Sequence, residues 1–161
     1  MERSMKLVVN PKWDEIERAR NESAEFFRSH GLPDEAVYGL TMVISELIEN
    51  SIKYGIFRSP ESKVTLDVHL GDTMITVEVI NPVDETAQDH LRRLDKTIQW
   101  IRGHQDPFEA YVERLKEVSK KPLYDTESGL GLVRIAYEGQ AILDFFVSED
   151  NNLSVSAVSD L

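Results

Sequence analysis

Apolar residues recur at intervals of three and four positions through several stretches of the chain, a spacing typical of amphipathic helices. The longest of these stretches cover residues 12–30, 33–55, 86–102 and about 106–120, and a shorter one covers about residues 132–137. Glycine and proline residues lie between the first two stretches and interrupt the period there. The pattern therefore predicts five helices.

Four shorter segments alternate apolar and polar residues, the pattern of strands with one buried face. Residues 63–70 and 73–80 flank the tight turn Gly71-Asp72, which predicts a β-hairpin. Residues 141–148 and 153–158 flank a second polar turn near the end of the sequence. This order of helices and strands predicts an α+β fold, in which helices cover one face of an antiparallel or mixed sheet.

The composition is that of a globular domain, with 41% hydrophobic and 29% charged residues among 161. No linker or repeat divides the chain, so we expect one domain over residues 1–161 with a helical insertion at about residues 85–122. The absence of cysteine excludes disulfides and thiolate metal sites. A net charge of −11 argues against nucleic acid or an anionic membrane as the main partner. Without a signal-peptide pattern or an apolar run of membrane-spanning length, a cytoplasmic location is expected.

The second predicted helix carries a column of polar side chains. Glu46, Asn50 and Tyr54 are spaced four residues apart and therefore share one face, with Lys53 beside them. Amide and carboxylate oxygens suit Mg²⁺, and a lysine ammonium suits phosphate oxygens. A solvated polar face is the alternative interpretation of this helix. Gly55 is expected to end the helix in the left-handed conformation.

A second polar pattern comes shortly before the last predicted helix, where the sequence reads Ser-Gly-Leu-Gly-Leu over residues 128–132. Two glycines at the start of a helix let backbone N–H groups approach a phosphate, and the helix dipole favours the negative charge. A flexible loop or a close helix contact would account for the same two glycines. The position of the motif, before the final two strands, is stronger evidence for a phosphate site than the two glycines alone.

Together the two patterns make the chain resemble the GHKL ATPase superfamily, which includes gyrase, Hsp90, histidine kinases and anti-sigma-factor serine kinases. The N box of that family, a Glu four residues before an Asn on a helix, matches Glu46 and Asn50, with Lys53 and Tyr54 following. The later glycine box matches residues 129–132. The resemblance covers most of the chain and implies a two-layer α/β sandwich of the Bergerat type, with a helical hairpin in the lid position.

One box departs from the family pattern. After the second strand the family has Asp-x-Gly-x-Gly, whose Asp binds the adenine amino group, whereas this chain has Asn-Pro-Val-Asp-Glu at residues 81–85. The Asn81 amide oxygen still offers an acceptor, but the glycines are absent and Pro82 stiffens the turn. With two helices in the lid position and the Ser-Gly-Leu-Gly-Leu motif, this combination resembles the SiaB-like branch, whose members are stand-alone bacterial relatives of anti-sigma kinases.

The resemblance implies a site for ATP and Mg²⁺. In such a site Asn50 would orient Mg²⁺, Lys53 would bind a terminal phosphate, and Tyr54 would pack near the base or ribose. Glu46 would act as the general base that takes a proton from the partner's hydroxyl. The adenine amino group and the phosphates would be bound, respectively, by Asn81 and by the loop residues Ser128, Gly129, Leu130, Gly131 and Leu132.

Members of this branch act in partner switching, in which a kinase phosphorylates a Ser or Thr of a small STAS-like partner and a PP2C-type phosphatase reverses it. The resemblance therefore implies a Ser/Thr protein kinase with a STAS-domain-like partner. The helical insertion also suits a homodimer or partner surface. A catalytically inactive module that binds and sequesters its partner is the main alternative, which the lost glycines favour. An ATPase without a protein substrate is a third.

Other polar residues of the predicted insertion have two interpretations. Arg92, Arg93 and Arg102 either supply positive charge to a nucleotide pocket or form a solvated helix face, and we prefer the solvated face. Trp100 is expected in the core. The four histidines are not at metal-ligand spacing and are expected to be structural or exposed.

Overall fold

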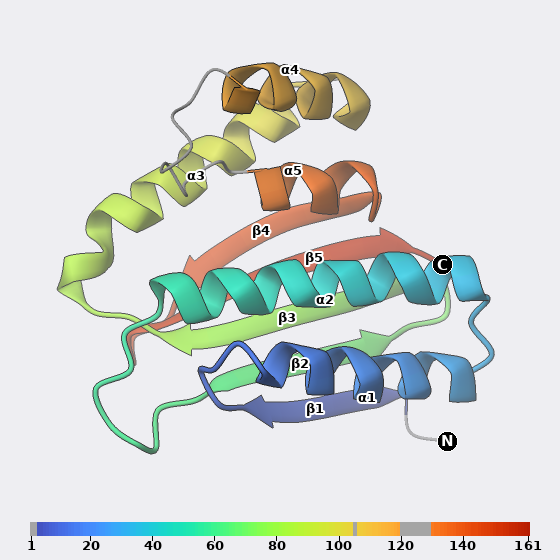
Figure 1. Cartoon of the computed structure of the whole chain (residues 1–161), viewed down its shortest axis with the longest axis horizontal. Helices are drawn as coiled ribbons and strands as arrows, with labels where there is room; N and C mark the ends of the chain where they lie inside the picture. Colours follow the sequence, from blue (N-terminus) through green and yellow to red (C-terminus); the bar gives the residue numbers. More distant parts are fainter. Residues whose placement is uncertain (1–2, 105, 120–129) are drawn as a thin grey trace.

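The computed structural model describes residues 3–104, 106–119 and 130–161. Its centre is a five-stranded sheet in the order β1-β2-β3-β5-β4, in which every pair of neighbours is antiparallel (Figure 1). The α+β prediction is confirmed, and the sheet is antiparallel throughout. The strands are β1 (Ser4–Val9), β2 (Val64–Leu70), β3 (Met74–Pro82), β4 (Ala141–Val147) and β5 (Asn152–Asp160).

Helices α1, α2 and α5 lie across one face of the sheet, and α3 and α4 form a hairpin beside α5 (Figure 1). This gives the two-layer arrangement with a helical hairpin that the resemblance implies. The part of the chain that the model describes contains no helix long and apolar enough to cross a membrane. The helices are α1 (Glu15–Ser29), α2 (Asp34–Tyr54), the 3₁₀ helix η1 (Glu85–Ala87), α3 (Gln88–Arg102), α4 (Pro107–Ser119) and α5 (Leu130–Tyr137).

Helix α2 lies at the centre of the core. Its buried side chains, among them Ile44, Leu47 and Ile48, cover the alternating inward residues of β2 and β3. Burial of this kind contributes about 1.5–3 kcal/mol for each large apolar side chain. Because the inner side of α2 is held against the sheet, its polar column is fixed on the opposite, accessible side.

One strand of the N-terminal half was missed, and one local prediction there is wrong. Strand β1 has a weak alternating pattern and was not predicted; it forms because β2 offers an edge, with Val9 opposite Val64 in the register. Gly55 is extended, with φ −69° and ψ 157°. Glycine is needed there for space, since a Cβ would lie 2.6 Å from the Ser51 carbonyl oxygen and 2.7 Å from the Phe57 ring.

Helix boundaries also differ from the predicted ones at several ends. Helix α1 begins at Glu15, three residues later than predicted, so Trp13 lies before it and is 58% exposed. Helix α5 begins at Leu130, two residues earlier than predicted. Strand β3 continues through Pro82, because Pro82 still lies opposite Asn152 of β5 in the antiparallel register.

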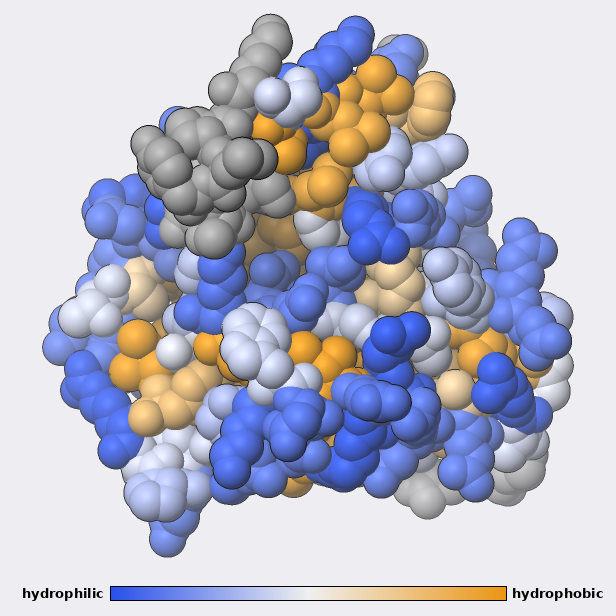
Figure 2. Space-filling view, viewed as in Figure 1, coloured by the Kyte–Doolittle hydropathy of each residue, from blue (hydrophilic) through white to orange (hydrophobic). Residues whose placement is uncertain are grey.

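The surface of the helical layer is not uniform. Hydrophilic residues cover most of the face seen in Figure 2, while apolar residues gather over α4. Phe108 and Leu115 of that helix are 46% and 40% exposed. Helix α4 therefore presents apolar surface to solvent, although its Ala110 is fully buried.

Candidate functional site

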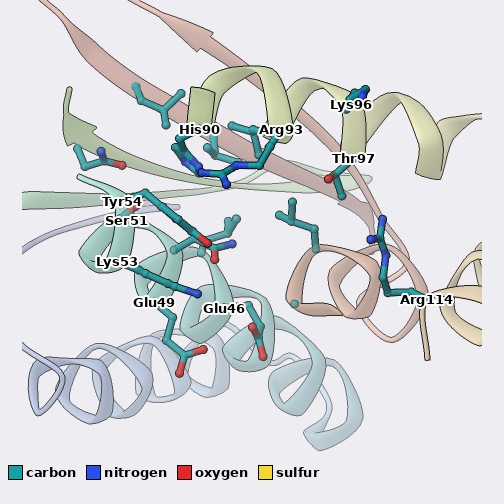
Figure 3. A pocket seen from close by; sticks show the side chains of 18 of the residues that line it. Glu46, Glu49, Ser51, Lys53, Tyr54, His90, Arg93, Lys96, Thr97 and Arg114 are labelled. Atoms are coloured by element: carbon teal, nitrogen blue, oxygen red, sulfur yellow. The ribbon is translucent and has the colours of Figure 1, made fainter. Parts of the chain in front are cut away.

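A cavity of about 900 Å³ opens between α2 and the α3–α4 hairpin, with residues of β3 and β5 at its base. Figure 3 shows Lys53 and Tyr54 on α2 and His90, Arg93 and Thr97 on α3 at opposite sides of this space, while the Glu46 and Glu49 carboxylates point away from α3. The polar column predicted for α2 therefore lies on one wall of a cavity. Six polar residues of α2 line this wall: Glu46, Glu49, Asn50, Ser51, Lys53 and Tyr54.

The hairpin forms the opposite wall. From α3 it contributes His90, Arg93 and Trp100 to the lining, and from α4 it contributes Arg114. Arg93 lines the cavity and is also exposed, so its exposure agrees with the preferred prediction of a solvated helix face. Arg92 is exposed and pairs with Asp89 at 3.0 Å, as that prediction expects.

Arg102 and Trp100, two other residues of α3, have different surroundings in the fold. Arg102 reaches the Leu143 carbonyl oxygen at 2.5 Å and lies 3.8 Å from the Asp144 carboxylate, so it covers the outer edge of β4. A hydrogen-bonded side chain on an edge strand hinders pairing with another strand. Trp100 packs against the core, as predicted, and it also lines the cavity, which was not predicted.

An aromatic contact joins the two walls at one end. The rings of Tyr54 and His90 are stacked, with centroids 3.9 Å apart and an interplanar angle of 12°. Lys53 Nζ lies 5.1 Å from the centroid of the Tyr54 ring. Tyr54 therefore contributes a flat aromatic surface at the cavity wall, where the resemblance places a base or ribose.

Glu46 lies against the start of α5. Its Oε1 accepts a hydrogen bond from Arg134 Nη1 at 3.0 Å. Its Oε2 lies so close to Gly131 that it would collide with a Cβ at that residue. A Cβ at residue 131 would displace the Glu46 carboxylate, so glycine at this position lets the carboxylate lie against α5. The two boxes singled out in the sequence thus meet in space.

The environment of Glu46 raises the pKa of its carboxyl above the usual 4.5. Burial is the largest cause, and repulsion from Glu49 adds to it, while Arg134 acts in the opposite direction. A carboxylate with a raised pKa is a stronger base than an exposed one. The role of Glu46 as a general base stays a prediction.

Asn81 lies at the base of the cavity and is 2% exposed. Its Nδ2 donates to the Pro82 carbonyl oxygen at 3.1 Å, which leaves the side-chain oxygen as the atom suited to accept from a ligand amino group. This position agrees with the predicted adenine contact. The ligand contact itself stays a prediction.

The glycine-rich motif is described in part. Leu130 is the first residue of α5, and Gly131 and Leu132 line the cavity. Ser128 and Gly129 lie outside the described residues. The structure thus places the second half of the motif at the site.

Several residues of the site were missed at the sequence level, among them Arg134, Trp13 and Arg114. Arg134 is one turn beyond Gly131 on α5, Trp13 precedes α1, and Arg114 is in the middle of α4. Arg134 follows Gly131 at helical i+3 spacing, a signal that could have placed both residues on one face. No local signal marks Trp13 or Arg114, since each reaches the cavity through packing of distant elements.

The cavity residues fit a magnesium ion that is bound mainly through phosphate. Mg²⁺ is usually held by one or two protein oxygens together with phosphate oxygens and water. The Asn50 side-chain oxygen is such a donor, and Lys53 can balance remaining phosphate charge. Within the described ranges, no group of three or more His, Cys, Asp or Glu side chains could hold a metal ion.

Comparison with known proteins agrees with the boxes and with the fold. The model of the histidine kinase-like ATPase domain family matches residues 9–136. A chain in the crystal structure of the SiaB–SiaC complex from Pseudomonas aeruginosa has the same fold, with a TM-score of 0.74 and 18% identity. The alignment covers 98% of this chain and 90% of that one. No curated protein sequence matches this chain.

Proposed function

Because the chain belongs to the histidine kinase-like ATPase family, we propose that its cavity binds Mg·ATP and that the protein is a Ser/Thr protein kinase. One observation carries this proposal: Asn50, Lys53 and Gly131 line the same cavity. In the family pattern, Asn50 and Lys53 belong to one box and Gly131 belongs to another. A cavity of about 900 Å³ is within the range for ligand pockets.

In this proposal each of the predicted site residues has a separate role in binding. Asn50 would hold Mg²⁺, which neutralises phosphate charge when bound, and Lys53 would bind a terminal phosphate oxygen. Tyr54 would pack near the base or ribose, and Asn81 would accept a hydrogen bond from the adenine amino group. The backbone at the start of α5, including Gly131, would donate to the phosphates.

The transfer itself needs one base. The partner's hydroxyl oxygen forms a bond to the γ-phosphorus, the bond between that phosphorus and the leaving oxygen breaks, and ADP departs. Glu46 takes the hydroxyl proton and becomes neutral. Its raised pKa supports this role, because a group with a pKa closer to neutrality accepts a proton more readily. Positioning and charge neutralisation supply the rest of the acceleration.

The proposed substrate is a small STAS-domain-like regulatory protein in bacterial partner switching, with a PP2C-type phosphatase reversing the reaction. The likeness in fold to a chain of a complex named SiaB–SiaC supports a protein partner. The exposed apolar side of α4 supports a partner or homodimer surface beside the cavity. A cytoplasmic location accompanies this proposal.

Calorimetry with Mg·ATP tests the nucleotide site. The unmodified protein should release or absorb heat on binding, and Asn50→Ala should abolish that signal. Asn21→Ala is the matched control, because it is the same substitution at an exposed position of α1. Absence of binding by the unmodified protein would contradict the nucleotide proposal.

Phosphate transfer to the partner tests the base. Glu46→Gln keeps the size and a hydrogen-bond acceptor for Arg134 but cannot take the proton. We expect Mg·ATP binding to persist and transfer to fall by about 10²–10⁴-fold, the usual range for a general base. Transfer at the normal rate would show that Glu46 has another role.

A second candidate function is a catalytically inactive module that binds and sequesters its partner. Pro82 favours it, because this residue stands within β3 where the family has a permissive glycine turn. Binding of the partner that is unaffected by Mg·ATP, by Asn50→Ala and by Glu46→Gln would support sequestration. A nucleotide-dependent change of the partner's mass by one phosphate would support the kinase.

A further inference from the structure

We propose that the α3–α4 hairpin binds the nucleotide's phosphates from the wall opposite α2, with Arg114 and Arg93 as ligands and Trp100 holding Arg114 in place. This inference rests on the proposed function and concerns the same cavity. It assigns to the hairpin the selection of a triphosphate over a monophosphate.

Arg114 is held in an unusual position for a cation. Its guanidinium lies 4.7 Å from the centroid of the Trp100 ring, and its side chain is 16% exposed. Nη1 pairs with Glu117 at 3.3 Å, while the buried Nε makes no hydrogen bond to any residue in the described ranges. A guanidinium placed over an aromatic ring keeps its N–H edges for hydrogen bonds, and the spacing of those N–H groups matches two oxygens of a phosphate.

The charge of the cavity points to an anionic ligand. The whole chain has 18 Lys and Arg against 29 Asp and Glu. The described residues that line the cavity reverse this ratio, with four cations against three carboxylates. Three of those cations belong to the hairpin, so the wall opposite Asn50 carries most of the positive charge. The cations are Lys53, Arg93, Lys96 and Arg114, and the carboxylates are Glu46, Glu49 and Glu117.

Because the cations lie on two walls, the contribution of the hairpin to binding should depend on the number of phosphates in the ligand. Asn50 and Lys53 are on α2, whereas Arg93 is on α3 and Arg114 is on α4, the two hairpin helices that also line the cavity. A polyphosphate carries enough charged oxygens to bind both walls at once. A monophosphate can occupy one wall, so its affinity depends less on the hairpin arginines.

Tryptophan fluorescence gives a direct measurement. The chain has two tryptophans, Trp13 and Trp100, and both line the cavity. With Trp13→Phe as the background, Trp100 reports alone on the Arg114 contact during titration with Mg·ATP and with AMP. Arg114→Gln should weaken Mg·ATP by about 10- to 100-fold, the range for a lost charge-assisted hydrogen bond. AMP affinity should change by less than about threefold.

Two further variants make the result specific. Arg92→Gln is the matched control, since Arg92 neighbours Arg93 on α3 but is exposed and paired with Asp89. It should leave the Mg·ATP affinity unchanged. Glu117→Gln should strengthen Mg·ATP binding, because it removes the carboxylate that competes for Arg114. If Arg114→Gln lowers the unfolding midpoint, Arg93→Gln provides the same test.

The outcomes separate this inference from the proposed function. Normal Mg·ATP binding with equal effects of Arg114→Gln and Arg92→Gln would overturn the inference and leave the nucleotide site standing. Failure to bind Mg·ATP, with inorganic tripolyphosphate binding that depends on Arg114, would overturn the nucleotide site and support the inference. Failure to bind either probe would overturn both.

Discussion

Replacement of Arg134 tests the electrostatic account of the Glu46 environment. Arg134 Nη1 lies 3.0 Å from Glu46 Oε1, and Arg134 Nη2 lies 3.1 Å from Glu138 Oε2. The Arg134 and Glu46 side chains are 33% and 17% exposed. Arg134→Gln keeps a polar side chain of similar shape but removes the charge, so Glu46 stays half-buried beside Glu49 without its cation.

The expected loss follows from distance and exposure. Two charges about 4 Å apart attract by about 1 kcal/mol in water and about 4 kcal/mol near a protein surface. The partial exposure of both groups places this pair between these limits, and loss of the helical contact with Glu138 adds about 0.3–0.5 kcal/mol. We expect Arg134→Gln to lower the free energy of unfolding by about 2 kcal/mol at pH 7.5, equivalent to a fall in Tm of roughly 4–8 °C.

The loss should depend on pH with a definite sign. The folded-state pKa of Glu46 is raised, so the folded protein binds a proton more readily than the unfolded chain, and stability falls as pH rises above about 4.5. Removing Arg134 raises that pKa further and makes the fall steeper. The difference between the two proteins should therefore be largest near pH 7.5 and nearly vanish by about pH 4, where Glu46 is protonated in both.

Urea unfolding monitored by circular dichroism at both pH values measures this difference. Arg92→Gln is the control, because its ion pair with Asp89 has the same 3.0 Å separation but side chains that are 73% and 85% exposed. That variant should lose less than about 0.5 kcal/mol. An equal loss in the two variants, or an undiminished deficit for Arg134→Gln at pH 4, would refute the account of a half-buried carboxylate held by Arg134.

Three further outcomes can be checked on purified variants. Gly131→Ala should displace the Glu46 carboxylate and reduce Mg·ATP affinity in calorimetry while the Tm changes little, because the colliding atom is the end of a flexible side chain. Gly139→Ala should lower Tm strongly and so give the opposite pattern, since its Cβ would lie 2.6 Å from both a backbone oxygen and Val43 Cγ2. The pKa of Glu15 is lowered to about 2, so Glu15→Gln should reduce stability at pH 7, with a deficit that disappears as pH falls towards 2.

Local spacing was sufficient for several parts of the site and fold. Glu46 and Asn50 share a face of α2 because the helical period requires it, and the apolar residues between them determine which side is buried. The β2–β3 hairpin follows likewise from alternation around Gly71. The assignment to the GHKL family, now confirmed, also depended on short motifs whose residues lie close together in sequence. The roles of the individual site residues stay predictions.

Contacts between distant segments could not be predicted in this way. Glu46 and Arg134 are 88 positions apart, and β1 exists because β2 accepts it as a neighbour. Arg92 and Arg93 show the limit most clearly, since both are arginines on one amphipathic helix. One is paired in solvent and the other lines the cavity, because the docking of α3 decides which side of the helix faces α2.

The sequence by itself determined every helix and strand except β1 and the 3₁₀ helix η1, and it determined which polar residues of α2 share a face, because these features depend on interactions within a few residues. The tertiary structure alone decided that this face meets Gly131, Arg114 and Trp13 around one cavity. The physical reason is that the packing of helices on the sheet depends on the combined fit of all buried surfaces. No single segment carries that information.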